Sequence, residues 1–126
     1  MPDIKEKGIS LLSSTSGVDM KTATTKRTLY TVPTGKTAVI TKVVVRAPSA
    51  SLSGGTSYAF GGTATCNDWK TGQSLATVTG ATLAMVISND NAAITLMVAG
   101  TVFGMYITTG STAAATATID VMGYIF

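Results

Sequence analysis

The stretch Ala115-Thr-Ala-Thr-Ile-Asp-Val-Met-Gly-Tyr-Ile-Phe126 decides the fold class of this chain. Apolar and polar residues alternate along it, so Ile119 and Val121 point to one side of an extended strand and Thr118 and Asp120 to the other. The residues between Asp90 and Asp120 carry no charge and are rich in Val, Ile and Thr, which favour strands. We therefore expect an all-β protein.

The composition fits one domain with a weakly charged surface. The chain has 126 residues, enough for a single hydrophobic core. Charged residues make up 12% of it, against a usual share of about 25%. Because charge keeps a free protein soluble and monomeric, so few charges predict an assembly with other subunits. The net charge of +3 is scattered rather than gathered in a basic stripe, and we expect no nucleic-acid partner.

Residues that usually carry catalysis or bind metals are scarce. There is no histidine, a single cysteine (Cys66), and six carboxylates that stand far apart in the sequence. This spacing contains no metal-ligand cluster, no nucleophile with a base and no phosphate-binding glycine loop. We predict that the protein is not an enzyme and uses no cofactor or metal. No signal peptide is visible, so we expect synthesis in the cytoplasm and no secretion.

Residues 1–28 are predicted to form an extended N-terminal arm, and residues 29–126 the globular domain. The arm holds eight of the fifteen charged residues, two Ser/Thr clusters and one compact apolar patch. It is either a disordered tail or a segment that becomes ordered on a neighbouring subunit. In the second case Ile9, Leu11 and Leu12 would anchor it.

About eight short strands separated by turns account for the rest of the chain. The strongest is 37–46, in which we expect Val39, Thr41, Val43 and Val45 to face the core. The other expected strands are 28–33, 57–61, 82–88, 92–98, 102–108 and 114–126, with a strand or short helix near 75–78 and a turn at 89–91. This spacing predicts an antiparallel β-sandwich, most simply of the jelly-roll type.

The uncharged span 91–119 also has the length of a membrane helix. Gly100 and Gly104 form a GxxxG motif, which pairs helices in membranes. However, residues 108–112 are polar, the span is rich in strand-forming residues, and no Lys or Arg follows Lys70 to fix an orientation. We therefore expect strands here and no membrane partner.

Trp69, in the loop-like segment 67–70, has three candidate roles. A lone Trp most often caps a sandwich core from a loop, which is the role we favour. The alternatives are an anchor for a protein interface and, together with Tyr58, a platform for a sugar ring. Cys66 is expected to be a small buried residue, because no base nearby would activate its thiol.

Two parts of the chain resemble small structural proteins of tailed bacteriophages. The first is Leu29-Tyr-Thr-Val-Pro-Thr-Gly-Lys-Thr-Ala-Val-Ile-Thr-Lys-Val-Val-Val-Arg46, which is similar to their opening aromatic-x-Val-Pro-x-Gly-Lys turn and the Val/Ile strand after it. The second, 99–111 with 117–124, is similar to their closing hairpin. Together the two parts cover about a third of the chain, and they are patterns of fold rather than of function.

The resemblance implies a virion component, most plausibly a capsid decoration (cement) protein with a jelly-roll sandwich that binds the outer surface of a bacteriophage head and stabilises it. Its partners would be the major capsid protein and copies of itself, as a dimer or trimer. The alternatives are a tail, fibre or head-spike module and, in another class, a carbohydrate-binding module. The residues expected at the capsid or subunit interface are Ile9, Leu11, Leu12, Lys21, Lys26, Arg27, Lys42, Arg46 and Trp69, with Lys42 and Arg46 facing an acidic capsid surface.

Overall fold

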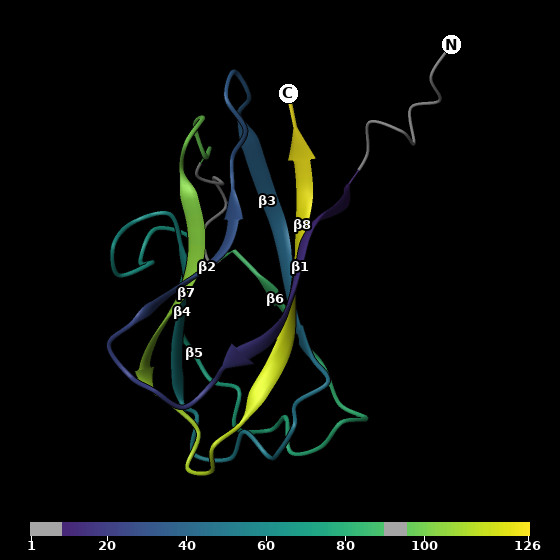
Figure 1. Ribbon diagram of the computed structural model, residues 1–126, viewed down its shortest axis with the longest axis vertical. Helices are drawn as coiled ribbons and strands as arrows, with labels where there is room; N and C mark the ends of the chain where they lie inside the picture. The colour runs from purple at the N-terminus through teal and green to yellow at the C-terminus, as the bar shows by residue number, and fades with distance from the viewer. Residues whose placement is uncertain (1–8, 90–95) are drawn as a thin grey trace.

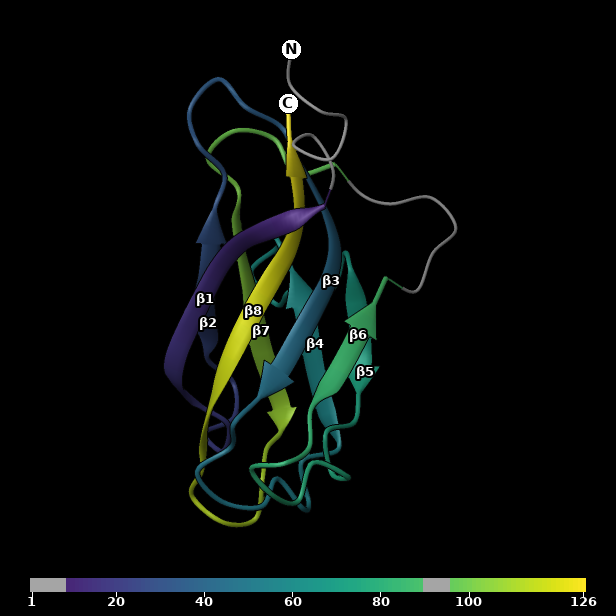
Figure 2. The same cartoon turned by 90° about the vertical axis from the view of Figure 1, so that its right-hand side faces the viewer.

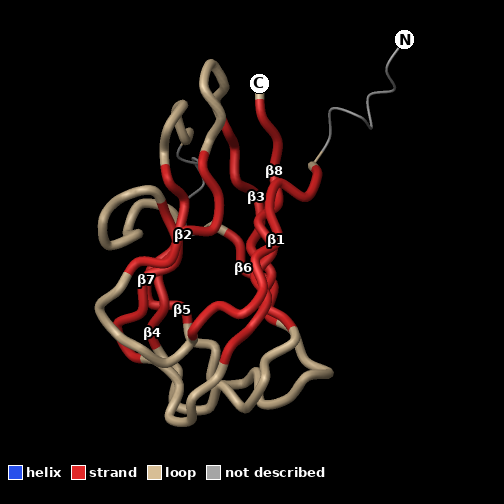
Figure 3. The backbone as a smooth tube through the Cα atoms, viewed as in Figure 1, coloured by secondary structure: helices blue, strands red, loops and turns tan. Residues whose placement is uncertain are grey.

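The computed structural model describes residues 9–89 and 96–126, and in these ranges every regular element is a β-strand (Figure 3). The prediction of an all-β protein is confirmed. The strands are β1 (Ser10–Asp19), β2 (Lys26–Thr31), β3 (Ala38–Arg46), β4 (Ser57–Gly61), β5 (Lys70–Gln73), β6 (Met85–Ser88), β7 (Val102–Thr109) and β8 (Thr116–Ile125).

The strands form two antiparallel sheets of four strands each, which we call the first and second sheets. The order is β1-β8-β3-β6 in the first sheet and β2-β7-β4-β5 in the second. Figure 1 shows the two sheets as separate layers, and Figure 2 shows the first sheet across the front. Buried side chains from both sheets form one continuous core, so the arrangement is sandwich-like.

The last strand behaves as its alternation predicts. Ala117, Ile119 and Val121 of β8 lie in the core, whereas Thr118 and Asp120 between them are only partly buried. The strand is central in the first sheet, with β1 on one side and β3 on the other. Its core face is therefore covered by the second sheet, while its polar face is turned outward.

The first half of β3 differs from the prediction. Val43 and Val45 are buried as expected, but Thr41 is only partly buried and Ile40 is fully buried in its place. The register against β8 shifts between Ile40 and Lys42, which marks a β-bulge at Thr41. The extra residue in a bulge reverses the alternation, so both ends of β3 put apolar side chains into the core.

The expected N-terminal arm over 1–28 is not what the structure shows from Ser10 onward. Strand β1 pairs along β8, and β2 pairs along β7, so both belong to the sheets. The predicted boundary between 28 and 29 falls inside β2. The first of the Ser/Thr clusters that suggest an arm in the sequence belongs to β1, an edge strand. Side chains at its exposed and half-exposed positions can be small and polar. Residues 1–8 lie outside the described part of the chain.

The remaining strand predictions hold in part. Strand β4 occupies 57–61 as expected, β6 takes up the second half of 82–88, and β7 covers 102–108 within the span considered as a membrane helix. Residues 75–78 form a turn closed by a hydrogen bond from Val78 N to Leu75 O, and the strand lies earlier, at β5. The expected strand 92–98 and turn 89–91 fall mostly outside the described residues, although Met97 bridges to Ala38.

Candidate binding surface

The outer face of the first sheet is the surface on which predicted contact residues come together, and we call it the open face. Residues directly opposite in neighbouring strands share a face, so the register of the sheet defines its members. One row pairs Leu11 with Met122 and Met122 with Lys42, and the next pairs Asp120 with Val44 and Val44 with Val86. The open face consists of Leu11, Ser14, Lys42, Val44, Arg46, Val86, Ser88, Thr118, Asp120 and Met122.

The bulge at Thr41 directs the basic residues of β3 onto the open face. After it, Lys42, Val44 and Arg46 point outward while Val43 and Val45 point into the core. The Thr41 hydroxyl donates a hydrogen bond to the Met122 carbonyl at 3.1 Å, which ties the bulge to β8. The position of Lys42 and Arg46 is therefore fixed by the sheet and not by a flexible loop.

The charges on the open face do not balance. Arg46 Nε lies 2.7 Å from Asp120 Oδ2, and the Ser14 hydroxyl donates to Asp120 Oδ1 at 2.6 Å. The hydrogen bond from Arg46, and then that from Ser14, keep the pKa of Asp120 below its usual value despite partial burial. Lys42 is exposed and has no ion-pair partner within the described residues. The face carries one excess positive charge among apolar side chains.

The outer face of the second sheet is covered by the chain itself. Several of its outward positions are small: Ala59, Gly61 and Gly104 are all buried although they point away from the core, while Tyr106, opposite Ala59, is half-buried. A methyl group on Gly61 would lie 2.0 Å from Asp68 Oδ1 and 3.1 Å from the Cys66 carbonyl oxygen, so the loop 62–69 lies directly over this strand end. The outer faces of the two sheets therefore differ in exposure. The chain covers this part of the second sheet, whereas Leu11 and Val86 on the first sheet stay exposed.

Lys26, one of the predicted contact residues, covers another part of the second sheet. Its stem lies over Gly104, where a methyl group would come 2.9 Å from Lys26 Cε. Its ammonium group donates to the carbonyl oxygens of Gly62, Thr63 and Val102 at 3.5, 3.0 and 2.6 Å. Lys26 is thus engaged inside the molecule and is not presented to a partner.

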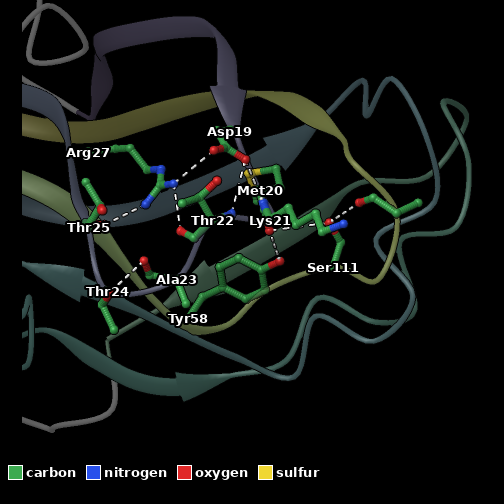
Figure 4. A network of polar contacts seen from close by, with 11 residues as sticks. Asp19, Met20, Lys21, Thr22, Ala23, Thr24, Thr25, Arg27, Tyr58 and Ser111 are labelled. Atoms are coloured by element: carbon green, nitrogen blue, oxygen red, sulfur yellow. Dashed lines mark hydrogen bonds and ion pairs between the residues drawn. The ribbon is translucent and has the colours of Figure 1, made fainter.

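Arg27 is also engaged internally, in a network at the end of β1 (Figure 4). Its guanidinium group donates to the carbonyls of Thr22 and Thr25 and lies 3.2 Å from Asp19 Oδ2. Hydrogen bonds from Thr22 and from the Lys21 backbone, with help from Arg27, lower the pKa of Asp19 to about 2. The guanidinium group of Arg27 is occupied by hydrogen bonds within the molecule. The interface role of Lys21, whose side chain is exposed, stays a prediction.

The same network reaches the core through Tyr58. The Tyr58 hydroxyl donates to the Met20 carbonyl at 2.7 Å, and burial raises the Tyr58 pKa to about 12. Ser111 N donates to the same carbonyl at 3.1 Å. These bonds hold the turn after β1 against the turn after β7, as Figure 4 shows. We call this network the clasp, because it links the end of β1 in the first sheet to Tyr58 and Ser111 on the side of the second sheet.

Trp69 occupies the core position that we favoured. It is 1% exposed, its Nε1 donates to the Ile40 carbonyl at 2.9 Å, and its ring meets Phe103 edge-on at 5.6 Å. Cys66 is buried as expected, and burial raises its thiol pKa to about 11. Because Tyr58 and Trp69 are both buried, neither offers a sugar ring a flat surface, and the platform assumed for carbohydrate binding is not there.

The three apolar residues expected to anchor an arm have separate positions. Ile9 and Leu11 are exposed, and Leu12 packs against the core at the bulge between Leu11 and Ser13. Leu11 belongs to the open face, opposite Met122. Sequence reasoning missed Val86 and Met122, which lie opposite Val44 and Lys42 of β3 in the sheet.

No reactive centre is found in the described residues. Within 9–89 and 96–126 no three of His, Cys, Asp or Glu gather as metal ligands would. No helix in these ranges is long and apolar enough to cross a bilayer. An open pocket of about 380 Å³ lies beside the end of β1, but its one carboxylate, Asp19, is already held by Arg27 and Thr22.

Comparison with protein-family models, with curated proteins and with solved structures finds no match to this chain. The outer face of the first sheet stays open in the fold. That face carries apolar side chains and one excess positive charge.

Proposed function

We propose that the protein is a non-enzymatic virion structural protein, a capsid decoration (cement) protein that binds the outer surface of a bacteriophage head through its open face. The observation that carries the proposal is the inequality of the two sheets. Lys26 and the loop 62–69 cover the second sheet, whereas Leu11, Val86 and Lys42 on the first sheet remain exposed. Exposed apolar groups on a rigid sheet are characteristic of interaction surfaces.

We further propose that the eight strands form a jelly roll. Four antiparallel pairs support this: β1 with β8, β2 with β7, β3 with β6 and β4 with β5. This nested pairing is what results when one long hairpin is rolled into two sheets. Jelly rolls occur in viral capsid proteins, lectins and cupins, so the fold is compatible with a capsid role but does not select it.

The charge on the open face suggests the chemistry of its partner. Lys42 lies between Met122 and Ser88, so docking brings its ammonium group to the partner. An acidic capsid surface would pair with it and would set the orientation of docking. A protein that binds only the assembled shell stabilises it by mass action, and many copies multiply the effect.

The direct test counts copies on particles. Particles purified from the phage that encodes this chain should contain it in many copies by mass spectrometry. Particles that lack it should form but lose their genome at lower temperature or under osmotic shock. A few copies per particle would contradict the decoration role and favour a tail, fibre or head-spike module.

A second test locates the contact on the open face. Wild-type and variant proteins are added back to particles that lack the protein, and bound copies are counted. Lys42→Glu should weaken binding by about tenfold or more, since it puts a carboxylate against an acidic surface. Lys36→Glu is the matched control, because Lys36 is exposed in the turn before β3 and lies outside the open face. Equal binding by the two variants would contradict the assignment of the face.

A further inference from the structure

A second apolar surface lies at one end of the molecule, where β8 finishes and β3 begins. We call it the apolar end, and it consists of Ile9, Leu96, Val98, Tyr124, Ile125 and Phe126, all of them exposed. Figures 1 and 2 both place the C-terminus, the start of β3 and the segment that leads into β7 at this end. The opposite end is formed by loops rich in Ser, Thr, Gly and Ala.

Backbone hydrogen bonds hold the apolar end in place. Phe126 N and O bond to O and N of Thr37, both at 2.9 Å, which extends the pairing of β8 with β3 to the last residue. On the other side of β3, Ala38 and Met97 exchange a second such pair, at 2.8 and 2.9 Å. The segments that carry Phe126 and Val98 are therefore fixed to the same strand. A rigid apolar surface loses little entropy when a partner covers it.

The charge pattern favours a second copy of the chain as that partner. The residues of the apolar end carry no charged side chain, and among the described residues Lys36 stands on the turn before β3, next to Thr37. Two copies can meet there without burying a charge, as the cores of homodimer interfaces do. Two open faces brought together would instead bury Lys42 twice, and the acid of that face, Asp120, is already paired with Arg46, so the burial is costly. Self-association is thus directed to the end and away from the open face.

We propose that a second copy of this chain docks on the apolar end, with Val98 and Phe126 in the contact. A two-fold pair is the simplest closed arrangement, because the same patch serves both copies. A pair formed through the apolar end leaves the open face of each copy free, so self-association does not depend on binding to a capsid shell. Self-association and particle binding can therefore fail separately.

The experiment compares two valines of nearly equal exposure on different surfaces. Val98 is 62% exposed at the apolar end and Val86 is 57% exposed on the open face. Sedimentation velocity is run on the full chain and on Val98→Asp and Val86→Asp over about 1 to 100 µM. The wild type should associate with rising concentration, Val98→Asp should weaken association by about tenfold or more, and Val86→Asp should associate as the wild type does.

Phe126→Ser, which truncates another 62% exposed side chain at the same end, repeats the test if Val98→Asp fails to fold by circular dichroism. A wild-type protein that stays monomeric throughout would overturn the proposal. So would loss of association in Val86→Asp but not in Val98→Asp, since that assigns self-contact to the open face. Flotation of monomeric wild type with phosphatidylglycerol vesicles, abolished by Val98→Asp, would overturn it in favour of a lipid surface.

Discussion

The two sheets of this protein bury their inner faces in the same way but treat their outer faces differently. On the second sheet, Gly61, Gly104 and Ala59 are outward positions beside Tyr106, and the two glycines let the loop 62–69 and the stem of Lys26 lie directly on the strands. On the first sheet, outward positions hold larger side chains such as Val44 and Val86, which no described segment covers. Small residues at these positions thus allow the chain to cover part of the second sheet, whereas Val86 on the first sheet stays exposed.

The largest effect should distinguish inner from outer faces within one strand. Val43 is fully buried in the core and its neighbour Val44 lies on the open face. Val43→Asp should abolish folding, at a cost of about 4 kcal/mol or more, because it buries an unpaired carboxylate. Val44→Asp should lower stability by about 1 kcal/mol or less. Thermal unfolding followed by circular dichroism measures both, and equal losses would show that the assignment of faces is mistaken.

The next effect concerns the loop that covers the second sheet. A methyl group on Gly61 would lie 3.0 Å from the backbone carbon of Cys66 as well as close to Asp68, and backbone cannot move aside cheaply. Gly61→Ala should therefore cost about 1–3 kcal/mol. Gly80→Ala is the control, since nothing lies within 4 Å of that position. Chemical denaturation of both variants should separate them; a neutral Gly61→Ala would mean that the loop does not press on the sheet.

The pattern of alternation was enough to predict the strands whose two faces differ strongly. In β8 apolar and polar residues alternate as far as Val121, and in β3 the polar residues Lys42 and Arg46 mark the outward face, so the core residues Ile119, Val121 and Val43 could be named in advance. The bulge at Thr41 could not, because nothing in the local sequence marks it. It is set by pairing with β8, a strand that lies far along the chain.

The error over β1 has a different physical cause. Half of its ten residues are Ser or Thr, and it lies at an edge where few side chains need to be apolar, so its pattern resembles that of a solvated tail. The buried Val18 and Met20 were the available signal. Only part of the open face could be predicted. The charges of Lys42 and Arg46 are visible in the sequence, but Val86 and Met122 lie beside them only because of the order of strands in the sheet.

A smaller effect compares two lysines, one on each outer face. Lys26→Met leaves three carbonyl oxygens on the second sheet without the ammonium group that they share, and should cost about 1–2 kcal/mol. Lys42→Met removes a charge that has no ion-pair partner within the described residues, so its stability should change by about 0.5 kcal/mol or less. Urea unfolding measures the difference. A stability loss for Lys42→Met equal to that for Lys26→Met would mean that the open face is closed by contacts of its own.

The smallest effect is pH-dependent and lies at the clasp that joins the two sheets. The pKa of Asp19 is about 2 in the folded protein and about 3.9 in an unfolded chain, so ionised Asp19 stabilises the fold above pH 4 and this contribution is lost as the pH falls to about 2. Because its side chain is 46% exposed, solvent screening should reduce the contribution to about 1 kcal/mol or less. Asp19→Asn should therefore be less stable than the wild type at pH 7, and the gap should close as the pH falls from 4 to 2.

Asp120→Asn, on the open face, is the matched control: its lowered pKa predicts the same sign of pH dependence, but Asp120 joins strands of one sheet only. If thermal unfolding showed a gap for Asp19→Asn that widened in acid, the carboxylate would not be what holds the clasp.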